Sequence, residues 1–151
     1  MGTVTYPNPE VERYIHQYFV PVQFNIVERP EVMDQFNSTW TPTIIVQDAD
    51  GREHRRAQGY LDPQRFLGEL ALARVKAAID RHDYQAAQQR AQEALEMTEG
   101  DPVREPEALY WASVADYKAS NDVNKLLHGW RELLNEFPES EWAKRAEFIR
   151  G

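Results

Sequence analysis

The stretch that most constrains the fold lies between residues 40 and 51. It reads Trp40-Thr41-Pro42-Thr43-Ile44-Ile45-Val46 and is followed by the turn Asp48-Ala49-Asp50-Gly51. The run from Thr43 to Gln47 is apolar without alternation, which predicts a strand covered on both faces. Gly51 suits a turn that requires positive φ. The charged run Arg52 to Ala57 predicts an edge strand protected by charge, so the whole stretch predicts a β-hairpin.

The segments around this hairpin predict a mixed α/β domain. Val20 to Val27 alternates and is rich in β-branched residues, which predicts a strand with Val22, Phe24 and Ile26 on one face. Helices are expected where an N-cap residue precedes apolar residues at three- and four-residue spacing. The helices predicted in this way run from Pro9 to Phe19, from Pro30 to about Phe36 and from Asp62 to near Arg81.

After residue 82 the sequence predicts helices alone. Each segment carries apolar residues at helical spacing, and breaks containing Gly100, Pro102, Asn121 or Pro138 separate the segments. The short connections predict antiparallel helix pairs. The predicted helices run from Tyr84 to Met97, from Pro106 to Ser120, from Asp122 to Phe137 and from Glu141 onward.

Composition excludes several classes of function. The 151 residues are 42% hydrophobic and 28% charged, which is ordinary for a globular protein, and no apolar stretch is long enough to span a membrane. A formal net charge of −8 disfavours nucleic acid as a partner. Because the chain has no cysteine, it contains no disulfide, thiol nucleophile or cysteine metal site. We expect a cytoplasmic protein with no nucleic-acid or membrane partner and no cofactor.

Six stretches in a fixed order carry a resemblance to a known family. They are Tyr6 to Glu10, Phe19-Val20-Pro21-Val22, Glu28-Arg29-Pro30, Trp40-Thr41-Pro42-Thr43, Asp48 to Gly51 and Gly59-Tyr60. With them, the segment from about Thr3 to Leu72 resembles the thioredoxin superfamily, and most of all bacterial thioredoxin-like proteins. The resemblance implies an α/β thioredoxin-like fold with a cis Thr41-Pro42 bond. It also implies a peptide-binding edge at Trp40, Thr41 and Pro42. An unrelated α/β domain with a trans-proline turn is the alternative.

The sequence departs from this family at its N-terminus, where members carry a strand and a Cys-x-x-Cys motif. We hypothesise that Met1 is an internal methionine of a longer protein, or that the chain was cut there. The resemblance places the missing strand between the Val20–Val27 and Thr43–Gln47 strands, which would otherwise have open edges. Either these two strands pair directly, or residues 2 to 5 insert, or a second chain fills the gap. We therefore expect a homo-oligomer.

The second half of the chain resembles tetratricopeptide repeats, whose unit is about 34 residues long. The resemblance rests on Tyr110, Tyr117, Trp130 and Pro138, which stand where the family has its packing aromatic residues and its closing proline. Ser113 and Leu126 depart from the pattern, which predicts looser or shifted packing. The predicted domains are a thioredoxin-like domain at 1–72 and all-α tetratricopeptide-like helical hairpins at 73–151. A generic helical bundle is the alternative.

Three functions remain open from the sequence. The leading interpretation is a module that binds a protein or peptide at the Pro42 edge or in the helical groove. The alternative is a thiol–disulfide oxidoreductase whose Cys-x-x-Cys lies upstream of Met1, and a third is a structural adaptor. We predict no catalytic residue and no metal site in this chain. The histidines show no metal-ligand spacing and are expected on the surface or on helix faces: His16, His54, His82 and His128.

Overall fold

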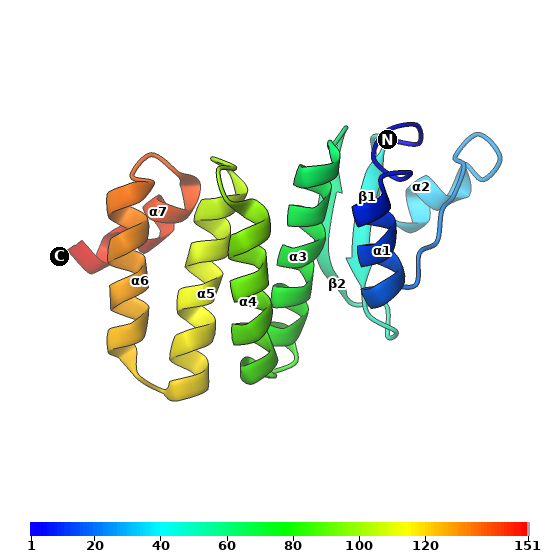
Figure 1. Cartoon of the computed structure of the whole chain (residues 1–151). Helices are drawn as coiled ribbons and strands as arrows, with labels where there is room; N and C mark the ends of the chain where they lie inside the picture. The colour runs from blue at the N-terminus through cyan, green and yellow to red at the C-terminus, as the bar shows by residue number, and fades with distance from the viewer. Residues whose placement is uncertain (151) are drawn as a thin grey trace.

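The computed structural model describes residues 1–150. Its elements form a row, with the sheet and the N-terminal helices at one end and the last helices at the other (Figure 1). The predicted helices are confirmed, with ends that shift by one or two residues. In chain order the elements are α1 (Pro9–Tyr18), α2 (Glu31–Gln35), β1 (Thr43–Gln47), β2 (Glu53–Gln58), α3 (Pro63–Asp80), α4 (Tyr84–Thr98), α5 (Arg104–Ser120), α6 (Val123–Glu136), α7 (Glu141–Ala146) and a 3₁₀ helix, Glu147–Arg150.

Side-chain caps explain where several of these helices begin. The side chain of Asn8 accepts hydrogen bonds from the backbone N–H groups of Glu10 and Val11, at the start of α1. Asp62, Asp83 and Ser140 cap α3, α4 and α7 in the same way. Such caps satisfy backbone donors that a helix leaves without internal partners. Local sequence therefore sets most of the helix starts.

Strands β1 and β2 form the predicted antiparallel hairpin. Ile44 lies opposite Ala57 and Val46 opposite Arg55, with an irregularity between Val46 and Gln47. The predicted turn is present, and the Asp48 side chain accepts hydrogen bonds from the backbone N–H groups of Asp50 and Arg52 at 3.0 Å each. Within residues 1–150 the sheet has two strands.

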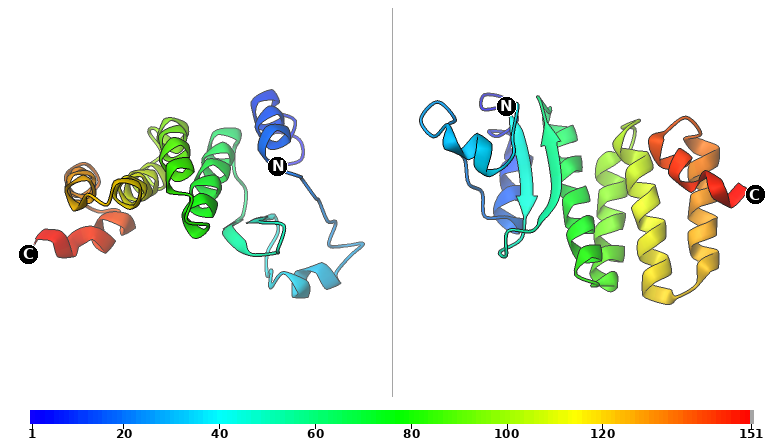
Figure 2. Two further views of the ribbon diagram at one scale, coloured as in Figure 1. Left: turned by 90° about the horizontal axis from the view of Figure 1, so that it is seen from below. Right: turned by 180° about the vertical axis from the view of Figure 1, so that it is seen from behind.

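The strand predicted at Val20–Val27 is wrong. Residues 19–25 run outside any helix or strand and connect α1 to α2, and Val20 and Val22 are 91% and 71% exposed. Figure 2 shows this connection passing well outside the hairpin, with α1 and α2 on opposite faces of the sheet. A β-prone sequence becomes a strand only when a neighbour supplies its hydrogen bonds. Here no neighbour does so.

Two of the expected ways of closing the sheet are also wrong. Residues 20–27 do not pair with β1, and residues 2–5 form turns instead of inserting as a strand. The N-terminal turns are fixed elsewhere, because the buried Thr5 hydroxyl donates to the Leu61 carbonyl at 2.6 Å. The edge of β1 that faces away from β2 therefore stays open.

Two expectations about the hairpin strands are corrected as well. Strand β1 is not covered on both faces, because Thr43 to Val46 are half-buried and Gln47 is exposed. Ile44 and Val46 pack on the main core, and Thr43 and Ile45 on the other face are half-buried as well. Strand β2 is an edge strand of the two-stranded sheet as predicted, but its charges do not all face solvent, since His54 is buried and Arg55 forms ion pairs with helices α3 and α5.

The main apolar core joins the hairpin region to the helices. It contains Val11 and Tyr14 of α1, Leu70 of α3, Ala91 of α4 and Ala112 of α5. The domain boundary expected between residues 72 and 73 falls inside α3, which is continuous across it. One long helix thus belongs to the packing of both halves.

The remaining helices pack side by side in chain order (Figure 1). Small residues allow close approach: Ala87, Ala91 and Ala94 of α4 are at most 1% exposed. A Cβ atom at Gly129 of α6 would lie 2.1 Å from the Ser113 Oγ of α5. Helices α5, α6 and α7 enclose a second core around Trp130 and Leu133. None of the helices described within residues 1–150 combines the length and the apolarity needed to cross a bilayer.

Candidate functional site

The loop before β1 is fixed by hydrogen bonds while its tryptophan faces solvent. The Thr41–Pro42 peptide bond is cis, as predicted. The Thr43 hydroxyl donates to the Trp40 carbonyl at 2.6 Å, and the Gly59 N–H donates to the Pro42 carbonyl at 2.8 Å. Trp40 nevertheless remains 65% exposed. The backbone is thus anchored at both ends of the Trp40-Thr41-Pro42 stretch, and an indole ring stands free beside it.

The outer edge of β1 is open to a further strand. Pro42 and Asp48 bond through their backbone to Gly59 and Arg52, on the side of β2. Hydrogen-bonding direction alternates along an antiparallel strand, so Ile44 also faces β2. Thr43 and Ile45 then direct their N–H and C=O groups away from it, and within residues 1–150 these groups have no backbone hydrogen bond. An edge of this kind can pair with an extended polypeptide.

Exposed apolar side chains concentrate in the region that carries this edge. Within residues 1–150, eight of the eleven exposed large hydrophobic side chains precede residue 61, although that stretch is well under half of the chain. They include Val20, Val22, Phe24 and Trp40. Phe24 is 41% exposed and lies against Phe36, with ring centroids 6.1 Å apart. Large exposed apolar patches mark interaction surfaces in soluble proteins.

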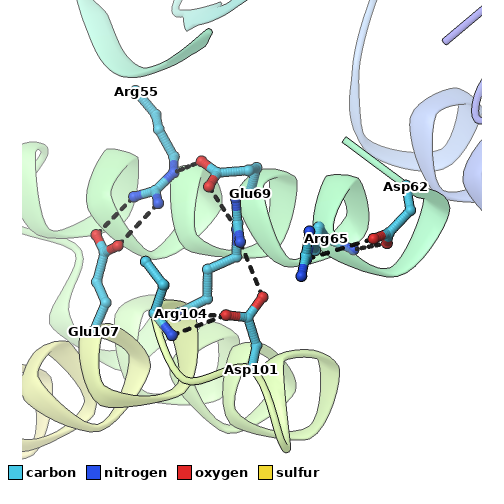
Figure 3. A network of polar contacts seen from close by, with 8 residues as sticks. Arg55, Asp62, Arg65, Glu69, Asp101, Arg104 and Glu107 are labelled. Carbon is cyan, nitrogen blue, oxygen red and sulfur yellow. Dashed lines mark hydrogen bonds and ion pairs between the residues drawn. The ribbon is translucent and has the colours of Figure 1, made fainter. Parts of the chain in front are cut away.

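A buried charge network joins β2 to α3 and α5. The Arg55 guanidinium donates to both Glu107 carboxylate oxygens at 2.7 and 2.9 Å and to Glu69 at 2.5 Å. Arg104 bridges the same Glu69, at 2.6 Å, to Asp101, at 2.9 Å (Figure 3). Burial lowers the pKa of Arg55, but its hydrogen bonds to Glu107 and Glu69 outweigh this effect and raise the pKa overall. Each of the three carboxylates accepts a hydrogen bond from one of the two guanidinium groups, so the network holds β2, α3 and α5 together.

Sequence reasoning missed this network, although one signal was present. Glu69 stands within the apolar run from Phe66 to Leu72, on a helix that was expected to face the core. A carboxylate at such a position requires a buried cation. The partners, Arg55 and Arg104, are 14 and 35 residues away along the chain, so pairing them required the fold.

His54 is buried between two carboxylates, which corrects its expected surface position. Its side chain is 1% exposed, with Nδ1 2.8 Å from Asp80 and Nε2 3.0 Å from Asp48. Both ring nitrogens therefore lie within hydrogen-bond distance of a carboxylate oxygen. The His54 hydrogen bond is the main cause that lowers the pKa of Asp48. Burial raises the pKa of Asp80, but hydrogen bonds from Lys76 and His54 lower it overall.

The four residues assigned to helical-repeat packing lie around α5 and α6, but they do not form one cluster. Tyr110 stacks on Trp130, with ring centroids 5.0 Å apart and planes 19° apart. Tyr117 is half-buried on α5 with Lys118 beside its ring, and Pro138 is exposed just after α6 ends. The Trp130 Nε1 is buried and has no hydrogen-bond partner within residues 1–150. The aromatic packing is thus confined to Tyr110 and Trp130 among the four.

A hollow of about 210 Å³ lies between α1 and α4, lined in part by Tyr14, Tyr18 and Glu93. The Arg74 guanidinium fills the neighbouring space, bonding Tyr14 at 2.9 Å and lying 3.4 Å from the Tyr18 ring centroid. Its charge is already matched by Glu93. Among residues 1–150, no group of three or more His, Cys, Asp or Glu side chains is placed to hold a metal ion.

Comparison with known proteins supports the interpretation of the first half. Residues 3–74 match the family model described as a thioredoxin-like domain. No curated protein and no solved structure matches the chain significantly. The matched segment ends inside α3 and contains no cysteine, and the packed helices α4 to α7 follow it.

Proposed function

We propose that this chain is a polypeptide-binding module in which an extended segment pairs with the open edge of β1 beside Trp40, Thr41 and Pro42. The observation that carries this proposal is the outward direction of the Thr43 and Ile45 backbone groups, which lack backbone partners within residues 1–150. Main-chain hydrogen bonds supply affinity in strand addition, and side-chain contacts supply selectivity. Trp40 provides an apolar contact at the end of this edge.

The composition of the edge favours binding over thiol chemistry for this chain. Dithiol exchange requires an attacking thiolate, and the chain has no cysteine. What the thioredoxin-like domain offers instead is a neutral, apolar strand, Thr43-Ile44-Ile45-Val46-Gln47, in a chain of net charge −8. An extended apolar segment without acidic residues is the partner chemistry that fits.

A synthetic peptide tests the proposal. The probe is a decapeptide of alternating valine and threonine with a lysine at each end, and the control peptide has proline at alternate positions so that it cannot complete a ladder. In dilute solution, where no second copy covers the edge, we expect the probe to slow hydrogen exchange at the Thr43 and Ile45 amides of the full chain, and the proline peptide to leave both rates unchanged. Equal rates with and without the probe would exclude this edge as the binding site.

A pair of variants assigns the role of Trp40. Trp40→Ala is expected to lower the affinity for the probe at least roughly fivefold, which corresponds to about 1 kcal/mol for a lost aromatic contact. Phe148→Ala is the matched control, because Phe148 is 73% exposed at the far end of the chain. The control should bind the probe as the unaltered chain does. A Trp40→Ala chain that binds equally well would limit the site to the backbone edge.

We also propose that α3 to α7 are tetratricopeptide-like helical hairpins that serve as a support for the binding edge. What supports this is the side-by-side packing of successive helices and the stacking of Tyr110 on Trp130. Network residues Glu69 and Glu107 fix β2 to these helices through Arg55. Circular dichroism of a chain ending after α4 tests the support. This chain lacks α5, and we expect the β1–β2 hairpin to be less stable in it than in the full chain.

A further inference from the structure

We infer that a second copy of this chain is the partner: residues 20–25 of one protomer pair with the open edge of β1 in the other, and the exchange is reciprocal. The inference rests on the proposed function, because it names the occupant of the same edge. It follows from two open segments on one chain, one able to give a strand and the other able to receive it.

The donor segment, residues 20–25, has the sequence pattern of a strand but is not a strand in the structure. Its residues are Val20-Pro21-Val22-Gln23-Phe24-Asn25, which alternate between apolar and polar from Val22 onward. Residues 20–24 make no backbone hydrogen bond within residues 1–150. Both ends of the segment are anchored. The Phe19 N–H closes α1 on the Ile15 carbonyl at 2.8 Å, and the Glu28 N–H closes a turn on the Asn25 carbonyl at 3.1 Å.

The proline in this segment fits pairing on one side. Alternate residues of a strand direct their N–H groups to opposite sides, so Val20, Val22 and Phe24 can face one partner together. Pro21, which has no N–H, then lies on the side away from that partner, where its missing donor costs nothing. The segment can therefore complete one edge, which is what the exchange requires.

The absence of charge in residues 20–25 and in β1 favours pairing between these two segments. The edges of natural sheets carry charges, prolines or bulges that block association. Residues 20–25 and β1 contain no charged residue, in a chain whose residues are 28% charged. Bringing the two segments together therefore introduces no repulsion, even though the net charge of −8 opposes general aggregation.

Reciprocity determines the number of copies. Each protomer gives one segment and receives one. In a pair of protomers the open β1 edge of each is therefore covered, and the assembly closes with two-fold symmetry. Val22, which is 71% exposed in one copy, would lie against the β1 edge of its partner. The expected species is a dimer that does not grow further.

Sedimentation equilibrium of the full chain tests the inference. We expect a dimer, and we expect Val22→Lys to lower its association constant at least roughly tenfold, because the charge enters a neutral interface. Val123→Lys is the matched control, since Val123 is 51% exposed on α6 and far from both edges. The control should dimerise as the unaltered chain does, and circular dichroism should show both variants folded.

The outcomes separate this inference from the proposed function. A monomer at millimolar concentration, or equal effects of the two lysine variants, would overturn the exchange. If the chain is monomeric but the valine–threonine probe still protects the Ile45 amide, the edge binds polypeptide and only the second copy is excluded. If the chain is monomeric and the probe protects nothing, both proposals fail.

Discussion

The two halves of this molecule differ in how completely each buries its apolar side chains and pairs its backbone hydrogen-bonding groups. In the helical half, Trp130 and Leu133 are 6% and 0% exposed, and α5, α6 and α7 enclose them. In the first half, Val20, Val22 and Trp40 lie in solvent, and β1 keeps an open edge. A helix forms its backbone hydrogen bonds internally, whereas a strand needs a neighbour. A row of helices can therefore form all its backbone hydrogen bonds within one chain, whereas the edge of a sheet still needs a partner strand.

The region between the halves shows how they are joined. Helix α3 packs with the hairpin and with α4, and the network around Arg55, Glu69 and Glu107 adds buried ion pairs across the junction. The incomplete sheet is thus held against a complete helical row. Changes at this junction should therefore cost more stability than changes at the exposed edge.

Removing Arg55 should cause the largest loss. Arg55→Ala leaves Glu69 and Glu107 buried without their cation, and breaking such a network costs about 3–5 kcal/mol of unfolding free energy. Arg65→Ala is the matched control, because Arg65 is 60% exposed and lies 3.4 Å from Asp62. Its loss should cost below about 1 kcal/mol. Urea unfolding measures both, and equal losses would show that the junction does not depend on the network.

Crowding the α5–α6 contact should have an intermediate effect. Gly129→Ala places a Cβ atom 2.1 Å from the Ser113 Oγ, and overpacking of this kind costs about 1–3 kcal/mol. The double variant Gly129→Ala with Ser113→Gly should recover most of the loss, because it removes the atom that clashes. Thermal unfolding compares the two, and no recovery in the double variant would place the strain elsewhere.

Acid should weaken the attachment of the hairpin turn to α3. The folded-state pKa values of Asp48 and Asp80 are lowered, so their stabilising contribution is present above about pH 4, the usual range for aspartate, and is lost as the pH falls below it. Asp80→Asn should make urea unfolding less dependent on pH between about pH 3 and 5. An unchanged pH dependence would mean that the contact between His54 and the two carboxylates contributes little.

The exposed tryptophan should matter least for stability. Trp40 is 65% exposed, so Trp40→Ala is expected to change the free energy of unfolding by less than about 0.5 kcal/mol. Trp130→Ala, in the closed helical half, should cost about 3–5 kcal/mol. If Trp40→Ala were strongly destabilising, its indole would serve the fold and not a binding surface.

Sequence alone predicted the helices and the hairpin because their signals are local. The side chains of Asn8, Asp62 and Ser140 cap helices, and the predicted turn from Asp48 to Gly51 forms where glycine allows it. The strand at Val20–Val27 was predicted wrongly for a non-local reason. Its pattern is that of a strand, but pairing depends on a neighbour that the pattern does not reveal.

The candidate site could be predicted only in part. Trp40, Thr41 and Pro42 were identified through resemblance, and the Thr41–Pro42 bond is cis as expected. The open groups at Thr43 and Ile45 depend on register, which only the fold supplies. Buried His54 looked like any surface histidine in the sequence, because its partners Asp48 and Asp80 lie on different elements.

Hydrogen exchange at the Ile45 amide reports whether another strand pairs with the open edge of β1. The Ile45 N–H faces the open edge of β1, whereas the N–H of its neighbour Ile44 faces β2. We predict that exchange at Ile45 slows as the concentration of the chain rises, while exchange at Ile44 stays slow throughout. Fast exchange at Ile45 at every concentration, and in the presence of the valine–threonine probe, would show that no strand pairs with this edge.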